Sequence, residues 1–249
     1  MKIDAKGIYY KELNELIHQA VNSGERDIIL DNVNGQRYIG AGLSGDIKII
    51  INGVPGNDLA AFMDEPTIIV NSNAQDGIGN TMNAGKIIVY GDAGDIVGHS
   101  MRGGKIFIKG EVGYRVGIHM KAYKELNPVV IAGGCSGDFL GEYMAGGLII
   151  LLGLGRAEGK RGNSHPIVGN YVGTGMHGGA IYIRGKVEKY QLGKEVKAIE
   201  LDEEDFREIE VYLREYCADF SLNFEEIIRD RFIKLIPYST RPYGRLYAY

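Results

Sequence analysis

A short motif recurs seven times along this chain: a Met or Leu follows a small residue by three positions and introduces an apolar run. Two looser copies end at Leu43 and Met63. The five strict Gly-x-x-Met copies are Gly79 to Met82, Gly98 to Met101, Gly117 to Met120, Gly141 to Met144 and Gly173 to Met176. The seven key residues are separated by 20, 19, 19, 19, 24 and 32 positions. Such a period predicts stacked structural repeats rather than one mixed globular core.

Composition limits the class of protein. Glycine accounts for 37 of the 249 residues, about twice its usual share, and hydrophobic residues make up 45%. A chain this apolar can form a core, so we interpret the glycines as sharp corners between strands. The net charge of −4 argues against a general nucleic-acid or anionic-membrane binder, which normally carries a basic stripe.

The cysteines and the N-terminus bear on cellular location. Cys135 and Cys217 lie far apart and lack the spacing of metal ligands, so they indicate neither an iron–sulfur cluster nor a disulfide framework. The first residues, MKIDAKGIYYKEL, are too polar for a signal peptide, and no apolar run is long enough to span a bilayer. We therefore expect a cytoplasmic protein that binds neither membrane nor nucleic acid.

The apolar pattern predicts helices at both ends and strands between them. Residues 10–24 have helical spacing and end at Gly24, where a C′ glycine would lie. Residues 198–236 are expected to form two helices, the second capped by Asn223 and stopped by Pro237. Seven apolar runs bounded by glycine lie between: 47–51, 67–70, 86–90, 105–109, 129–132, 148–152 and 180–184. Because no helical pattern separates them, they predict a coiled parallel β structure and exclude βαβ units.

Aligning the repeats sorts the strand residues into columns, because side chains alternate between the two faces of a strand. The columns that contain Ile87 and Val89 are uniformly aliphatic and are expected to face the interior. The column between them should face outward, yet it is apolar and consists of Ile88, Phe107, Ile150 and Tyr182. Such a face needs a cover, either the chain's own helices or another protein. We therefore name these four residues as a candidate partner face.

Two segments match the dinucleotide-binding fingerprint Gly-x-Gly-x-x-Gly. They are Gly40, Gly42 and Gly45, and Gly173, Gly175 and Gly178. The fingerprint holds a pyrophosphate only where a helix follows, because the helix N-terminus supplies the amide donors. Strands are expected after both segments, so we favour tight corners and predict no cofactor in this chain.

A column of mostly Asp and Asn residues lies six positions before the key methionines. Its members are Asp76, Asp95, Tyr114, Asp138 and Asn170. Stacked turns would bring neighbours within roughly 5 Å, so Asp76 and Asp95 could form a paired-carboxylate site of a Ca²⁺-dependent polysaccharide-cleaving β-helix. Asp and Asn also hydrogen-bond turns and tolerate left-handed conformations. We favour this structural role, because no Arg, Lys or His column accompanies the acids, and we name no catalytic residue.

The remaining candidate ligands do not converge. His99, His119 and His177 occupy different positions of the repeat, so a shared metal site is not expected. The methionine column is expected to pack in the core rather than to bind a soft metal. A loop over 154–166 is interpreted either as a solvated bulge or as a docking loop, and its basic residues are Arg156, Lys160, Arg161 and His165.

The repeats resemble a known family. The segments DGIGNTMNAGKIIVYG, DIVGHSMRGGKIFIKG and YVGTGMHGGAIYIRG are similar to the Gly-x-Gly-x-Gly domain at the C-terminal end of the glutamate synthase large subunit. The resemblance covers about 40–236 and includes the segment FIKLIP. It implies a mainly β fold, a single-stranded right-handed parallel β-helix of about seven coils.

That large subunit also carries a glutaminase domain with an N-terminal cysteine nucleophile, and a barrel that binds FMN and an iron–sulfur cluster. Neither is expected here, because position 2 is Lys and the sequence has neither a cysteine cluster nor βα alternation. The resemblance therefore implies a non-catalytic scaffold in glutamate biosynthesis and nitrogen metabolism. It would organise separate amidotransferase and FMN-binding synthase subunits, with FMN and the iron–sulfur cluster on those partner chains.

Two other functions are compatible with the repeat. A scaffold-like component of formylmethanofuran dehydrogenase is built on the same motif, and a stand-alone carbohydrate-active enzyme would use the Asp column. A homo-oligomer is a further option. We expect one domain in three parts: a helix and a first strand over 1–38, the β-helix over 39–197, and a helical pair with a Tyr- and Arg-rich tail over 198–249. The terminal helices are expected to cover the open strand edges.

Overall fold

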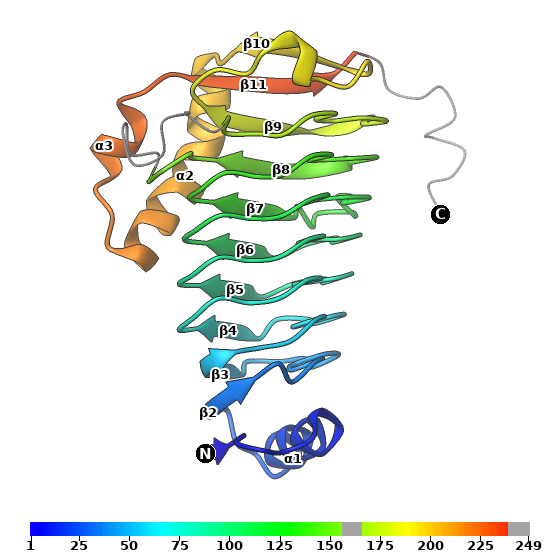
Figure 1. Ribbon diagram of the computed structural model, residues 1–249, viewed down its shortest axis with the longest axis vertical. Coiled ribbons are helices and arrows are strands. Elements are labelled where there is room, and N and C mark those ends of the chain that lie inside the picture. Colours follow the sequence, from blue (N-terminus) through cyan, green and yellow to red (C-terminus); the bar gives the residue numbers. More distant parts are fainter. Residues whose placement is uncertain (156–165, 239–249) are drawn as a thin grey trace.

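The computed structural model describes residues 1–155 and 166–238. Its strands stack one above the next along the long axis and form a parallel β-solenoid (Figure 1). The four basic residues expected in the 154–166 loop, and the tail after Tyr238, lie outside the described residues.

The expected strands are all present. The seven apolar runs form β3 (Lys48–Val54), β4 (Thr67–Val70), β5 (Lys86–Val89), β6 (Lys105–Ile108), β7 (Val129–Ala132), β8 (Ala145–Leu151) and β9 (Gly178–Arg184). Each pairs in parallel with the next. Residues one repeat apart face each other, as Ile87 does Ile106, so the sequence period sets the strand register.

The parallel ladder begins closer to the N-terminus than expected. Strand β1 (Lys2–Asp4) pairs with β2 (Asp27–Asn34), and β2 pairs with β3, so the ladder extends beyond the boundary placed at residue 39. Helix α1 (Tyr10–Asn22) lies below the stack in Figure 1 and buries Leu13, Ile17 and Ala20. Gly24 follows it with φ of +100°, the left-handed region that favours glycine after a helix.

The C-terminal end contains two helices within the expected range 198–236, but both ends of that range form strands. Strand β10 (Val196–Glu200) and strand β11 (Phe232–Pro237) pair antiparallel, and β11 also pairs antiparallel with β9. Helix α2 (Glu203–Phe220) and the short helix α3 (Phe224–Ile228) lie between β10 and β11 in the chain. A 3₁₀ turn (Lys189–Gln191) precedes β10. Two strands therefore continue the ladder beyond β9. A segment as short as FIKLIP is only marginally stable as a helix, whereas the edge of the sheet supplies hydrogen-bond partners for its backbone.

The interior of the solenoid is built from the predicted columns. The side chains of Ile87, Ile106, Ile149 and Ile181 are fully buried, and so are those of Val89, Ile108, Leu151 and Ile183. The key residues Leu43, Met63, Met82, Met101, Met120, Met144 and Met176 are at most 3% exposed. The methionine column is therefore core packing, because the thioether side chains fill the inside of each corner.

The outward apolar column is covered by the chain itself. Ile88 is 6% exposed, and Phe107, Ile150 and Tyr182 are fully buried. They form a second apolar cluster with the inner stripe of α2, which includes Ile209, Leu213, Tyr216 and Phe220. The candidate partner face is thus covered by α2. Of the two covers considered, the chain's own helices and another protein, the structure shows the first.

Candidate functional site

The corners before strands β3–β9 share one unusual backbone geometry. We define a corner as the six residues that end at a key Met or Leu. The inner position is the third residue before the key residue, and the outer positions are the fifth and the first before it. All three have φ between +52° and +74° in every corner, as at Gly77 (+74°), Gly79 (+66°) and Thr81 (+55°). Alternate residues of the corner are therefore left-handed.

This alternation directs the corner amides along the stack. The backbone N–H groups of Gly77 and Thr81 donate to carbonyls of the following turn, at Asp95 (2.9 Å) and His99 (2.8 Å). The N–H of Gly79 donates in the opposite direction, to the carbonyl of Leu59 in the preceding turn (2.8 Å). The five corners between the first and the last follow this pattern and hydrogen-bond both neighbours, so the buried backbone groups of a tight bend are satisfied.

The inner position is glycine for a steric reason. A Cβ added to Gly79 would lie 2.4 Å from Cδ1 of Ile106, and one added to Gly141 would lie 2.6 Å from Cδ1 of Ile181. Ala60 is the one inner residue that is not glycine. The two matches to the dinucleotide-binding fingerprint, which begin at Gly40 and Gly173, belong to the same corners. A strand rather than a helix follows each of them.

The outer positions face away from the core and are mostly not glycine. Eleven of the fourteen carry side chains, all half-buried or exposed: Tyr38, Asp58, Phe62, Thr81, Ile96, Ser100, Arg115, His119, Phe139, Tyr143 and Tyr171. A left-handed conformation costs such residues roughly 1–2 kcal/mol each relative to glycine. Bulky side chains at the outer positions therefore lower the stability of the fold. Because strained conformations cluster at functional sites, we take this edge as a candidate functional site.

Aromatic rings line this edge in the turns that lead into β7, β8 and β9. The rings of Phe139 and Tyr171 stack with centroids 4.9 Å apart and planes 15° apart, and the Arg115 guanidinium lies 5.1 Å from the Phe139 centroid. Beside them, His119 and Tyr143 stack at 5.3 Å and 9°. We call these five residues the aromatic edge. Tyr143 is 39% exposed and Tyr171 55% exposed, so the edge is open to solvent in the described structure.

A small cavity of about 380 Å³ lies at the C-terminal end of this edge. Tyr143, His177, Glu195 and Tyr238 are among the residues that line it. The Glu195 carboxylate accepts a hydrogen bond from the Gly175 N–H (3.1 Å), and the backbone N–H of Tyr238 donates to the Glu195 carbonyl (2.7 Å). The described part of the chain therefore ends beside the aromatic edge.

The Asp column is a ladder of side chain to backbone hydrogen bonds. Oδ1 of Asp76 accepts from the N–H of Asp95 (2.9 Å), Oδ1 of Asp95 from the N–H of Tyr114 (2.8 Å), and Oδ1 of Asp138 from the N–H of Asn170 (2.7 Å). The structural role is thus the one observed, although the bonds reach the next turn rather than the residue's own. Glycine precedes each donor residue because a Cβ at Gly94 would lie 2.0 Å from Oδ1 of Asp76.

Charged groups hold α2 against the solenoid. Lys86 on β5 pairs with Glu215 (2.8 Å) and Asp219 (2.5 Å), and Lys105 on β6 also pairs with Glu215 (2.7 Å). Burial tends to raise the pKa of Glu215, but the two lysines outweigh it and hold that pKa below its usual value. The Tyr216 hydroxyl donates to the Ile108 carbonyl (2.9 Å). These contacts orient α2 along the stack.

A second polar cluster connects α2 to β9 and β11. The buried Tyr182 hydroxyl donates to Glu208 (3.0 Å) and lies 3.3 Å from Asp205, and Lys234 on β11 pairs with Asp205. Burial raises the pKa of Tyr182, and the adjacent carboxylates raise it further, so the phenol stays protonated as a donor. This cluster explains why a residue with a hydroxyl group stands in a column whose other members, Ile88, Phe107 and Ile150, are apolar.

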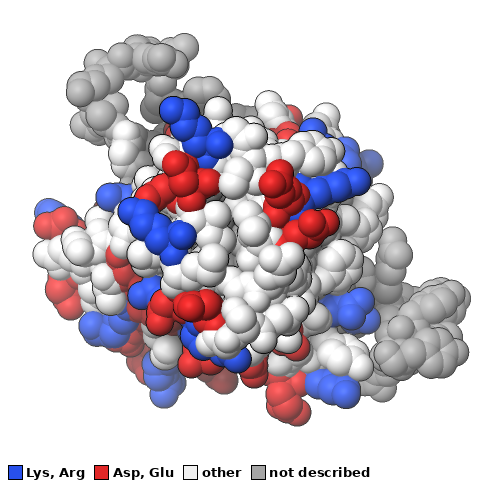
Figure 2. All heavy atoms as spheres, turned by 90° about the horizontal axis from the view of Figure 1, so that it is seen from below, with Lys and Arg blue, Asp and Glu red and all other residues white. Residues whose placement is uncertain are grey.

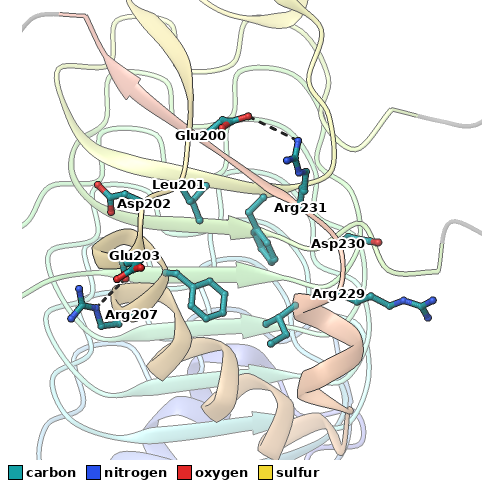
Figure 3. Close-up of a pocket in the computed structure, with 11 residues that line it drawn as sticks. Glu200, Leu201, Asp202, Glu203, Arg207, Arg229, Asp230 and Arg231 are labelled. Atoms are coloured by element: carbon teal, nitrogen blue, oxygen red, sulfur yellow. Dashed lines mark hydrogen bonds and ion pairs between the residues drawn. The ribbon is translucent and has the colours of Figure 1, made fainter.

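Another cavity, of about 720 Å³, lies where β10, α2, α3 and β11 meet (Figure 3). Leu201, Phe206, Ile228 and Phe232 supply its apolar lining. Its rim carries both signs of charge: Arg231 lies 4.0 Å from Glu200, and Arg207 donates to the Glu203 carbonyl (3.1 Å). Nothing in this arrangement selects one ligand.

The described histidines do not converge on one site. His99 and His119 have ring centroids 6.2 Å apart, while His177 lies in the small cavity. Burial, followed by the charge of His119, lowers the pKa of His99. Within residues 1–155 and 166–238, no group of three or more His, Cys, Asp or Glu side chains is placed to hold a metal ion.

Two further observations bear on partners. Lys and Arg are interspersed with Asp and Glu on the end where α1 lies, seen from below in Figure 2, so this face carries no field of a single sign. Among the helices of the described ranges, none combines the length and the apolar character needed to cross a bilayer.

Comparison with known proteins places the chain. The model of the GXGXG motif family matches residues 17–239. This chain belongs to that family. The resemblance to the glutamate synthase domain is thereby confirmed, and the left-handed positions five, three and one before the key residue have the spacing of the three glycines in the motif's name.

Two further proteins are similar to this chain, one in sequence and one in fold. An uncharacterized protein of Methanocaldococcus jannaschii is 50% identical over 252 residues, which cover 99% of this chain and 95% of that protein. A crystal structure of the formyltransferase/hydrolase complex FhcABCD from Methylorubrum extorquens, in complex with methylofuran, contains a chain with a TM-score of 0.58 and 17% identity. The match covers 86% of this chain and 83% of that one, and at this identity it shows a shared fold.

Sequence reasoning missed the aromatic edge. It aligned the repeats on Gly and Met and did not compare the residues five and one positions before the key residue. The signal was present, because those positions carry Arg115, Phe139 and Tyr171 in one column and His119 and Tyr143 in the other.

Proposed function

We propose that this chain is the non-catalytic structural subunit of a glutamate synthase-type complex. It would hold a separate glutaminase and a separate FMN-dependent synthase together, so that ammonia passes from one to the other. FMN and the iron–sulfur cluster would be bound by the partner chains. The complex would act in the cytoplasm, in glutamate biosynthesis.

One observation carries this proposal: the GXGXG match spans residues 17–239, so the family's scaffold domain accounts for nearly the whole sequence. Two features support it. The carboxylates that an enzyme of the β-helix type would use are engaged by backbone amides at Asp76, Asp95 and Asp138. The exposed aromatic edge, built at a cost in stability, offers a surface for other proteins.

Reconstitution tests the proposal. The chain would be tagged in its native host and purified gently, and co-purifying proteins would be identified by mass spectrometry. We expect a glutaminase and a flavoprotein, and we expect that omitting this chain abolishes glutamine-dependent glutamate formation while ammonia-dependent formation persists. Recovery of a lone chain, or glutamine-dependent activity without it, would contradict the proposal.

A second candidate is a scaffold of a formyl-transferring complex, as in formylmethanofuran dehydrogenase. The structural match to a chain of the FhcABCD complex favours it. The same purification separates the two, because the co-purifying proteins would then be similar to formyltransferase/hydrolase subunits rather than to a glutaminase.

A further inference from the structure

The charges on the outside of the corners change sign along the stack. We count the corners from the N-terminus and call them, with the two residues after each key residue, the corner edge. The second corner supplies three acids and no base: Asp58, Asp64 and Glu65. The fourth and fifth corners supply three bases and no acid: Arg102, Arg115 and Lys121. The third corner is uncharged, so the edge is acidic on one side of it and basic on the other.

These charges are open to a partner. Asp64, Glu65, Arg102 and Lys121 are exposed, and within the described ranges none of the four forms an ion pair. The Arg115 side chain is 49% exposed, and its Nε lies 3.6 Å from Oε2 of Glu142, which is longer than a hydrogen bond. Asp58 is half-buried and accepts a hydrogen bond from Asn80 (3.3 Å). Separated patches of opposite sign favour a surface with the reverse order of charge.

A second copy of this chain offers that reverse order. A two-fold axis that lies between two corner edges, perpendicular to the stack, reverses the order of the corners and keeps each column of the repeat opposite itself. If the axis passes between the third and fourth corners, the second corner of one copy faces the fifth corner of the other. Asp58 then faces Arg115, and Asp64 faces Lys121. A parallel pair of edges would instead place each acid opposite its own equivalent.

The uncharged residues fit the same register. Phe62, which is 59% exposed, faces His119, and Gly42 faces Tyr143, so the largest ring meets a position without a side chain. Moving the axis by one corner toward the C-terminus would place the three acids opposite the sixth corner, whose charged residue is Glu142. Moving it the other way would leave them opposite the fourth corner, which has the single base Arg102. One register is therefore favoured over its neighbours.

We propose that the chain forms a two-fold symmetric dimer through the corner edge, with the axis between the third and fourth corners. Asp58 of one copy pairs with Arg115 of the other, and Asp64 with Lys121, so each pair occurs twice. The interface covers His119 and Tyr143 of the aromatic edge. This proposal is independent of the glutamate synthase-type complex, because it concerns the purified chain alone.

A charge swap at the exposed pair tests the proposal. Sedimentation equilibrium at low salt would compare the natural full-length chain with Asp64→Lys, Lys121→Asp and the double variant. We expect the natural protein to be a dimer. Each single change should raise the dissociation constant at least about tenfold, because like charges then meet twice in the symmetric interface. The double variant restores both pairs and should return to within about threefold of the natural value.

The control is Glu204→Lys, the same change of charge at an exposed residue of α2, and it should leave the dissociation constant unchanged. Circular dichroism melting checks that every variant is folded. Should a reversal fail to fold, Asp64→Asn and Lys121→Gln replace it and should weaken the dimer by a smaller factor. A monomeric natural protein, a dimer that the substitutions leave intact, or a folded double variant that stays monomeric would each overturn the proposal.

Discussion

Two surfaces on the outside of this solenoid differ in whether the chain itself covers them. The column from Ile88 to Tyr182 is buried beneath α2, while the aromatic edge stays open among the described residues. The covered column uses ordinary strand conformations and gains stability from its own helix. The aromatic edge holds its side chains in left-handed conformations, which lower stability. The difference indicates that the first surface serves folding and the second serves binding.

The largest effect should separate two phenylalanines, one in the covered column and one at an outer corner position of the kind that forms the aromatic edge. Phe107 is fully buried and contacts Tyr216, whereas Phe62 at an outer corner position is 59% exposed. We expect Phe107→Ala to lower the free energy of unfolding by about 3–5 kcal/mol, and Phe62→Ala to change it by about 0.5 kcal/mol or less. Urea unfolding of both variants measures this. Similar losses for the two would refute the division into folding and binding surfaces.

The next effect concerns the inner and outer corner positions. Gly79→Ala places a methyl group against Ile106 in a left-handed residue, so we expect a loss of about 2–4 kcal/mol. Ser100→Gly is the matched change at an outer position with φ of +52°. It relieves backbone strain but adds entropy to the unfolded chain, so stability should stay within about 1 kcal/mol. A harmless Gly79→Ala would remove the steric explanation of the motif.

A smaller effect is expected from the Asp ladder. Asp95→Ala leaves the Tyr114 amide without its acceptor and should cost about 1 kcal/mol. Asp95→Asn keeps an acceptor oxygen and should cost less. Thermal unfolding compares the two variants. If the natural protein cleaves polysaccharide and Asp95→Asn lacks that activity, the carbohydrate-active enzyme is the correct interpretation.

The smallest effect is a dependence on pH at the α2 interface. The folded-state pKa of Glu215 is below its usual value, so its contribution to stability is fully present above that usual value. The contribution is lost as the pH falls through the lowered pKa. We expect Glu215→Gln to reduce the acid-induced loss of stability between roughly pH 5 and roughly pH 3, as measured by urea unfolding across that range. Glu210→Gln, on the same helix in a pair with Arg214, removes a carboxylate that does not pair with Lys86 or Lys105 and is the matched control.

Much of this fold could be predicted because its information is local and repeated. The corners need glycine where a Cβ would meet Ile106 or Ile181, and the interior needs aliphatic columns, so both leave a periodic trace. The C-terminal segment has no repeat. Phe232 and Leu235 fit a helical stripe and a strand equally well over six residues, and only the free edge of β9 decides for the strand.

The sequence by itself determined the solenoid, its register and the inner side of every corner, because each depends on residues within one repeat and on identical neighbours one period away. The tertiary structure decided what covers the outside. Whether α2 lies on Phe107 and Tyr182 depends on where segments far apart in the chain are brought together, as with Lys86 and Asp219. Such contacts have no period, and they leave no pattern that spacing can reveal.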